Sequence, residues 1–172
     1  ATTMPTPDFP GNSFGQGKNV PAIAMAHGIP YVATATVADL HDLERKVRYA
    51  MSFHGARYIH ILVPCPLGWG APSAKTIELA RLAHETGLFP VFEAEYGEVT
   101  NVSKIRRKQP VEKYLMLQKR FAHLFGKKGN PEIVQRMQAL ADRNIARYGL
   151  LGDEQGDDIP VPEQAEERHH VI

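Results

Sequence analysis

The sequence predicts an α/β fold in which a parallel sheet is flanked by helices. Short β-branched apolar runs alternate with amphipathic helical patterns over about seventy residues, as they do in βαβ units. Most glycines and prolines stand at the ends of these apolar runs, where they mark the turns and loops between elements. The chain of 172 residues, 43% of them hydrophobic, is long enough to form one domain with a real core.

The first helix and the first strand are both short. Residues 20–26 are apolar and Gly28 follows them, which predicts a short helix with glycine just past its end. Residues 31–37 are rich in β-branched side chains and mostly uncharged. This run predicts a strand buried on both faces, as strands of parallel sheets are.

A second helix and a second strand follow. Asp39 is a suitable N-cap for a helix over residues 39–51. In that helix, Glu44 and Arg48 are spaced to form an ion pair on the solvent-facing side. Residues 58–63 are apolar and end at a proline, which predicts a second central strand.

The next segment contains a loop, a helix and a strand. We expect a loop over residues 64–70, and then a helix that Ser73 caps and Gly87 ends. Residues 88–94 predict a further strand. Proline cannot donate a hydrogen bond to a neighbouring strand, so Pro90 places this strand at an edge of the sheet.

The last third of the chain is predicted to be helical. One helix starts at Pro110 and carries apolar side chains as far as Leu124. Another has Asn130 as its N-cap and Gly149 as its stop. The expected organisation is an α/β domain over residues 1–105, a C-terminal helical extension over residues 106–150 and an acidic flexible tail over residues 151–172.

Charge and composition exclude several classes of partner. There are 20 Lys and Arg residues against 19 Asp and Glu residues, a net charge of +1, so neither nucleic acid nor a membrane surface is an expected partner. No apolar stretch approaches the roughly 18–20 residues that span a membrane, and no secretory signal is visible. A single cysteine excludes an internal disulfide. We therefore expect a cytoplasmic protein.

The single cysteine lies in the most informative segment of the sequence. Cys65 belongs to a Pro-Cys-Pro-x-Gly-Trp motif directly after a predicted strand. In open α/β sheets, ligands bind beyond the carboxyl ends of strands. Three interpretations remain open: a buried, inert thiol, a nucleophile that would need a nearby base such as His60, or one ligand of a metal centre whose other ligands come from elsewhere.

Other polar clusters carry weaker signals. The histidines lack the spacing of a zinc site. The basic run Lys104–Lys108 is interpreted as a solvated loop, with a contact to a phosphate such as that of coenzyme A, or to an acidic partner, as the alternative. Acidic residues of the tail are too mobile by composition to form a metal site.

Beyond these patterns, the sequence resembles a known family. The Pro-Cys-Pro-x-Gly-Trp motif and its surroundings are similar to the C-terminal half of the thiamine-diphosphate-binding β subunit of 2-oxoacid:ferredoxin oxidoreductases. The similarity covers about residues 1–148 and is carried by residues 17–34, 55–70, 85–90, 110–115 and 120–124.

The resemblance implies a fold, an activity and cofactors. Residues 1–105 would form part of a thiamine-diphosphate-binding domain, and Cys65 would be one of four ligands of a [4Fe-4S] cluster, with Trp69 near it. Trp69 packing in the core is the equally weighted alternative. The subunit would act only in a heteromeric complex, and would help to convert a 2-oxo acid, pyruvate by default, to an acyl-coenzyme A. Electrons would pass to iron–sulfur clusters and to ferredoxin or another acceptor.

Two departures keep alternatives open. The family's Gly-Asp-Gly segment for thiamine diphosphate and Mg²⁺, and its early cysteines, lie N-terminal to Ala1 in the pattern and are not found in this sequence. We therefore expect a fragment or a split subunit that is inactive alone. The alternatives are a family member acting on an aryl 2-oxo acid such as phenylglyoxylate, and a non-catalytic interaction subunit with an inert thiol.

Overall fold

The computed structural model describes residues 18–127 and 129–152. Residues 1–17 and most of the predicted flexible tail, residues 153–172, lie outside these described residues. The first tail residue, Leu151, is described and bridges Ile105. Helices (α, or η for 3-10 turns) and strands run in the order α1 Val20–Ala26, β1 Tyr31–Thr36, α2 Leu40–Ala50, β2 Arg57–Leu62, α3 Pro66–Trp69, η1 Ser73–Lys75, α4 Thr76–Glu85, β3 Phe92–Glu95, β4 Glu98–Val102, α5 Val111–Met116, η2 Lys119–Leu124 and α6 Pro131–Tyr148.

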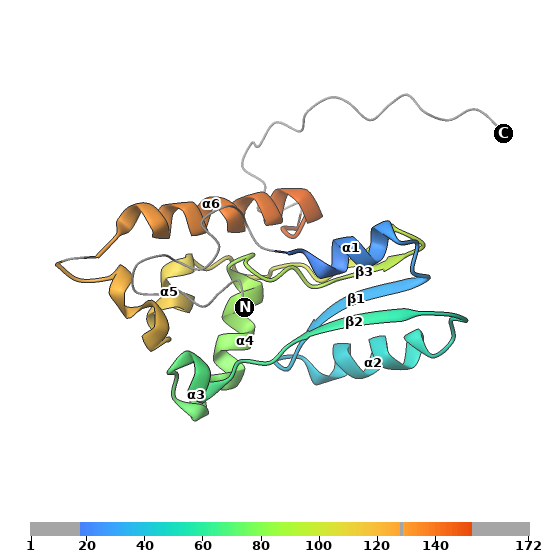
Figure 1. Ribbon diagram of the computed structural model, residues 1–172, viewed down its shortest axis with the longest axis horizontal. Helices are drawn as coiled ribbons and strands as arrows, with labels where there is room; N and C mark the ends of the chain where they lie inside the picture. Colours follow the sequence, from blue (N-terminus) through green and yellow to red (C-terminus); the bar gives the residue numbers. More distant parts are fainter. Residues whose placement is uncertain (1–17, 128, 153–172) are drawn as a thin grey trace, which may run out of the picture.

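The described part of the chain has an α/β architecture, which confirms the predicted fold class. Its four-stranded sheet has the order β2-β1-β3-β4. Figure 1 shows α1 and α2 on opposite faces of this sheet, with α4 and α5 beyond one end of its strands and α6 running above them as far as α1. The fold is consistent with part of a thiamine-diphosphate-binding domain, flanked on one side by the C-terminal helices.

Strand β1 forms the centre of the core. All six of its residues are buried, as the β-branched run predicted. Val32 faces α1 and packs with Phe92 of β3, whereas Tyr31 and Ala33 face α2 and pack with Ala50. This alternation follows from the two-residue period of a strand.

The sheet is mixed rather than wholly parallel. Strand β1 pairs with β2 in parallel, but β3 runs antiparallel to β1. Strand β4, which the sequence analysis missed, pairs antiparallel with β3 through a tight turn at Tyr96 and Gly97. Both turn residues have positive φ, of 50° and 93°, as two-residue hairpin turns require.

Two predicted strand positions were therefore wrong. The strand expected at an edge, β3, lies inside the sheet between β1 and β4. It begins at Phe92, two residues after Pro90, so the proline never has to donate within the strand. Strand β2, expected to be central, is an edge strand within the described sheet, and its residues are only half-buried or exposed.

Most predicted helix ends are confirmed. The side chains of Asp39 and Asn130 cap α2 and α6 by accepting from backbone N–H groups, as predicted. Asn19, which the sequence analysis did not single out, caps α1 in the same way. On the solvent side of α2, Arg48 donates to Glu44. Gly149 ends α6 in a left-handed conformation with φ of 55°, which avoids the strain that a Cβ would bring.

Three helical predictions need correction. Ser73 makes no capping hydrogen bond, because it opens the 3-10 turn η1 and α4 begins only at Thr76. The helix expected from Pro110 to Leu124 is broken into α5 and η2. The buried Gln118 stands at this break in extended conformation and donates from its side chain to the carbonyl of Tyr114. The loop expected at 64–70 contains the one-turn helix α3.

A second hydrophobic cluster joins the C-terminal helices to α4. It is formed by the buried residues Leu79, Leu82, Ala83, Val111, Tyr114, Leu115, Phe121, Leu124, Val134 and Ala141. Trp69 of α3 and Phe89 pack against it while partly exposed. The helical extension therefore shares a core with α4; the exact domain boundaries at 105 and 150 stay a prediction.

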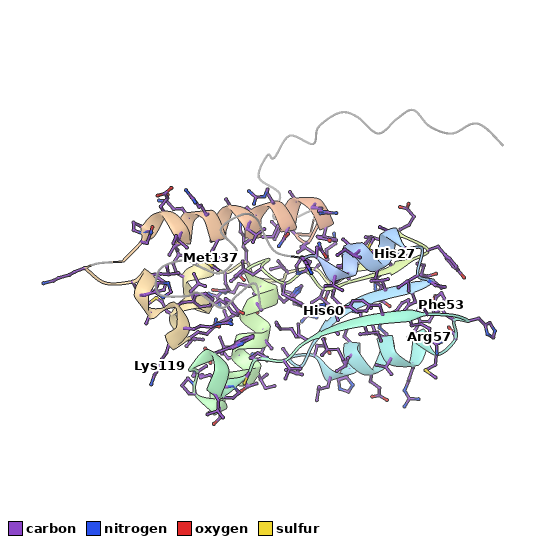
Figure 2. All side chains as sticks on the ribbon, in the orientation of Figure 1. His27, Phe53, Arg57, His60, Lys119 and Met137 are labelled. Atoms are coloured by element: carbon purple, nitrogen blue, oxygen red, sulfur yellow. The ribbon has the colours of Figure 1, made fainter. Side chains whose placement is uncertain are left out.

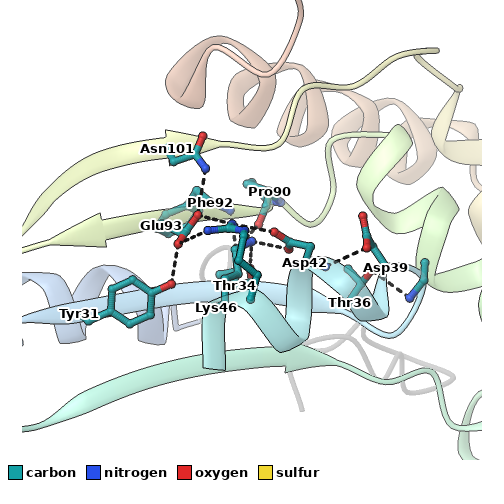
Figure 3. Close-up of polar contacts among 12 residues, drawn as sticks. Tyr31, Thr34, Thr36, Asp39, Asp42, Lys46, Pro90, Phe92, Glu93 and Asn101 are labelled. Carbon is teal, nitrogen blue, oxygen red and sulfur yellow. Dashed lines mark hydrogen bonds and ion pairs between the residues drawn. The ribbon is translucent and has the colours of Figure 1, made fainter. Parts of the chain in front are cut away.

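A buried ion-pair network ties β1, β3, β4 and α2 together (Figure 3). Glu93, only 3% exposed, accepts from the Tyr31 hydroxyl at 2.7 Å, from Arg45 at 2.6 and 3.2 Å, and from the Asn101 amide at 2.9 Å. Beside it, the buried ammonium of Lys46 donates to the carbonyl of Thr34. The network supplies four donors to one carboxylate, which compensates the desolvation of its charge.

This network predicts a loss of stability in acid. Burial alone would raise the pKa of Glu93, but the hydrogen bonds from Arg45, Tyr31 and Asn101 outweigh it and lower the pKa from 4.5 to about 2. The folded pKa lies below the unfolded one, so the stabilisation is complete above pH 4.5 and is lost as pH falls towards 2. We expect a loss of about 3 kcal/mol across that window.

The measurement is urea unfolding at pH 7, 4.5 and 2. Glu93→Gln, which cannot titrate, is the control, and its unfolding free energy should fall less over the same range. Equal pH dependence of the two proteins would show that Glu93 does not contribute.

Candidate functional site

Cys65 lies just beyond the carboxyl end of β2, where the sequence analysis placed it. It is the N-cap of α3, and its Sγ accepts a hydrogen bond from the Gly68 N–H at 3.4 Å. The Trp69 N–H donates to the Cys65 carbonyl at 2.9 Å, which closes the single turn. Pro66 at the first helical position has its φ preset for the turn. The thiol is thus held by a rigid backbone.

The thiol is exposed rather than buried. This excludes the interpretation of Cys65 as a buried core thiol in the described structure. Exposed apolar side chains surround it in sequence: Ile61 and Val63 are 41% and 57% exposed and Leu67 is 95% exposed. Ile61, Val63 and Cys65 alternate along the chain and are all exposed, so this side of β2 presents an apolar, cysteine-bearing surface.

Trp69 packs towards the second hydrophobic cluster and carries a cation above its ring. The Cζ atom of Arg120 lies 4.0 Å from the centroid of the indole, a cation–π distance. Sequence reasoning weighed Trp69 but missed Arg120, because the two residues are far apart in the chain and no local pattern links them. The structure thus supports a packing role for Trp69 and adds a charged partner.

His60 does not serve as a base for Cys65 in this structure. The Nδ1 atom of His60 is hydrogen-bonded to the Tyr58 hydroxyl at 2.9 Å, and its ring packs near Phe89. Figure 2 shows His60 on β2, between the sheet and the C-terminal helices. Among the described residues, the thiol accepts its hydrogen bond from the Gly68 N–H and not from a histidine. A Cys–His nucleophilic pair therefore has no geometric support.

His84 is the other histidine with a distinctive environment. Burial lowers its pKa, with hydrogen bonds to the backbone of Lys104 and Phe89 acting in the opposite direction. Its Nδ1 atom is buried and has no hydrogen-bond partner within the described structure. The side chain lies on α4 and is half-buried, and no other histidine, cysteine or carboxylate in the described structure joins it in a metal site.

The described residues do not form a complete metal site. Across residues 18–127 and 129–152, no group of three or more His, Cys, Asp or Glu side chains is placed to hold a metal ion. Cys65 nevertheless fits the role of a single cluster ligand, because it is exposed on a rigid turn and a backbone N–H points at its sulfur. The structure is compatible with one ligand of four from this chain.

The basic run Lys104–Lys108 is largely structural. The Lys104 ammonium donates to the carbonyl of Gly149 at 2.6 Å, and Lys108 pairs with Asp142 at 2.9 Å. Ile105 is buried and bridges Leu151. The two arginines between them, Arg106 and Arg107, are exposed and have neither a hydrogen bond nor an ion pair among the described residues. The two lysines thus bind the carbonyl that follows α6 and a carboxylate on α6.

No helix among the described residues is both long and apolar enough to cross a membrane.

Comparison with known proteins places this site in context. The chain is 50% identical over 133 residues to "Pyruvate synthase subunit PorB" of Methanosarcina barkeri, an alignment that covers 77% of this chain and 45% of the relative. It is 36% identical over 181 residues to the PorB subunit of Pyrococcus furiosus, covering 95% of this chain and 52% of the relative. The chain is related to the B subunits of 2-oxoacid oxidoreductases.

Subunits of more than one oxidoreductase share this relationship. "Ketoisovalerate oxidoreductase subunit VorB" of Pyrococcus abyssi is 42% identical over 121 residues, covering 69% of this chain and 38% of the relative. No family model matches the chain. The chain spans about half the length, or less, of these curated relatives. The relationship confirms the resemblance to 2-oxoacid:ferredoxin oxidoreductase β subunits.

Proposed function

We propose that this chain forms the C-terminal half of the thiamine-diphosphate and [4Fe-4S] subunit of a heteromeric 2-oxoacid oxidoreductase. The 50% identity to a pyruvate synthase PorB subunit carries the proposal. The exposed Cys65 at the end of β2 supports it. The chain would act in a cytoplasmic complex with the other subunits, and would not be active alone.

In this proposal, the role of the chain is to hold one corner of the cluster. The Cys65 Sγ would bind one iron, and the Gly68 N–H would donate to the bound sulfur, a kind of hydrogen bond that tunes cluster potentials. The apolar side chains Ile61, Val63 and Leu67 would exclude water once the partner segment covers them. When bound, thiamine diphosphate supplies the decarboxylation chemistry and the cluster takes up the electrons.

Pyruvate is the proposed substrate, with coenzyme A as acyl acceptor and ferredoxin or a similar protein as electron acceptor. The PorB relatives support pyruvate, since their identities reach 50%. A branched 2-oxo acid is the second candidate, because a VorB subunit is 42% identical over 121 residues. Turnover of pyruvate and ketoisovalerate by the purified complex separates the two.

The ligand role of Cys65 predicts a specific loss of iron. In the complex purified without oxygen, Cys65→Ala should remove one cluster, about four iron atoms per copy of this chain. The electron paramagnetic resonance signal of that reduced cluster should fall at least about tenfold, since even residues that only support a ligand alter metal affinity by 10–100-fold.

The matched control is Met116→Ala, which shortens a sulfur-containing side chain that is 69% exposed on α5. It should leave the iron content unchanged. Unchanged iron and an unchanged signal in Cys65→Ala would reject the ligand role and leave the chain as a non-catalytic interaction subunit.

A further inference from the structure

The turn that carries Cys65 is held against the 3-10 helix η2. Gly70, which ends α3 with φ of 63°, accepts a hydrogen bond on its carbonyl from the Lys119 N–H at 3.2 Å. A Cβ atom on Gly70 would lie 2.7 Å from the Lys119 Cβ, so the two segments touch at this point. Figure 2 shows Lys119 next to α3. Two segments that are about fifty residues apart therefore share one contact.

Arg120 extends this contact from backbone to side chains. Its guanidinium carbon lies 4.0 Å from the Trp69 ring centroid and 4.7 Å from that of Phe121. The Arg120 Nε donates to the Gln118 side chain at 2.8 Å. Gln118 is itself 1% exposed and donates to the carbonyl of Tyr114. The guanidinium is thus oriented by a buried amide and lies against two aromatic faces.

Space filling alone does not explain why an arginine is half-buried here. Burial lowers the pKa of Arg120, and the neighbouring Tyr114 hydroxyl acts in the opposite direction. An apolar side chain of similar length would fill the space without that desolvation. What the guanidinium adds is a planar, directional contact with the indole, since Arg stacks on aromatic faces with its fork held by hydrogen bonds.

A restricted Trp69 also restricts Cys65, because the two residues are hydrogen-bonded in the same turn. The Trp69 N–H is bonded to the Cys65 carbonyl, and the Gly68 N–H to the Cys65 Sγ, so the indole and the thiol belong to one hydrogen-bonded turn. Fixing the indole therefore restricts where the sulfur can lie. A metal ligand must be held to within about 0.5 Å of its working position, and neighbouring residues that pack against it provide this precision.

We propose that Arg120 is a positioning residue, which clamps Trp69 and thereby sets the position of the Cys65 Sγ for cluster binding. The proposal rests on the proposed function of Cys65 as a ligand. It gives the C-terminal helical extension the role of positioning a ligand that lies on a turn after β2 in the α/β domain. Arg120 itself touches neither the substrate nor the cluster in this role.

Hydrogen exchange in the 172-residue chain tests the clamp without the cluster. Arg120→Met keeps the length of the side chain but removes the planar cation. The N–H groups of Gly68, Trp69 and Gly70 should then exchange at least tenfold faster, whereas those of β1 and the middle of α6 should keep their rates. Arg120→Lys keeps the charge without the planar fork, and should give an intermediate increase.

Arg136→Met is the matched control, because Arg136 is 75% exposed on α6 and pairs only with the exposed Glu132 in the described structure. It should not change exchange around Cys65. If Arg120→Met loosens β1 as well, Arg120→Lys becomes the deciding variant. Exchange at residues 68–70 that matches the control in both Arg120 variants would overturn the clamp.

The assembled complex provides the second test. Arg120→Lys should retain the cluster but shift or broaden its reduced-state resonance signal, and change its midpoint potential, because the sulfur is no longer held in one place. A wild-type signal and potential in both Arg120 variants would overturn the proposal. Retention of the cluster in Cys65→Ala would instead reject the proposed function, while the exchange result on the clamp would still stand.

Discussion

Gly87→Ala is expected to destabilise the fold by about 3 kcal/mol or more. Gly87 has φ of 79°, a conformation that disfavours any residue with a Cβ. A Cβ there would also lie 2.6 Å from the Ile145 side chain and 2.9 Å from the Ala141 carbonyl of α6. The backbone strain costs about 1–2 kcal/mol. The overpacking against α6, which must move away, costs about 1–3 kcal/mol more. Urea unfolding monitored by circular dichroism measures the loss.

Gly28→Ala separates the two causes. Gly28 has a similar φ of 64°, but an added Cβ would meet nothing within 4 Å. This variant should lose only the backbone contribution, about 1 kcal/mol. Equal losses in the two variants would show that the close approach of α6 to Gly87 does not contribute. The Asn144 side chain, which donates to the Gly87 carbonyl, supports that close approach.

Glu93→Gln is expected to destabilise the fold by about 2–3 kcal/mol. Each oxygen of the carboxylate accepts two donors, from Tyr31 and Arg45 on one side and from Arg45 and Asn101 on the other. An amide group must replace one oxygen, so a pair of donors then faces an NH₂ group in either orientation. Removing one partner of a buried pair costs about 3–5 kcal/mol. The half-exposed Arg45 can regain water, which places the loss at the lower end.

The matched control is Glu44→Gln on the solvent side of α2. Glu44 and Arg48 form an ion pair at 2.6 Å, but both side chains are more than half exposed. The control should change the unfolding free energy by less than about 0.5 kcal/mol. Comparable losses at Glu93 and Glu44 would contradict a special role for the buried network. Both variants are read at pH 7, far above the lowered pKa of Glu93.

Local elements could be predicted from the sequence where one short-range cause determines them. The caps Asp39 and Asn130 and the stop Gly149 were predicted, because a cap depends on bonds within one turn. The burial of β1 was also predictable, since a β-branched run without charges suits only the interior. The position of Cys65 beyond the end of β2 followed from the strand and the proline after it.

Features that depend on distant partners were missed. Strand β4 carries polar residues and is mostly exposed, so no apolar alternation marks it, and its pairing with β3 makes β3 an interior strand. The edge position of β2 and the exposure of Cys65 beyond its end were likewise not marked by any local sequence pattern. Arg120 could not be connected with Trp69, since a cation–π contact leaves no spacing in the sequence.

The sequence by itself determined the α/β class, the main helix ends and the resemblance that the relatives at up to 50% identity confirm. The tertiary structure decided the direction of β3, the exposure of Cys65 and the contact between η2 and the cysteine turn. The physical reason is range: a cap or a buried run is decided by neighbours within a few residues. Strand order and the stacking of Arg120 on Trp69 are decided by segments that meet only when the core has formed.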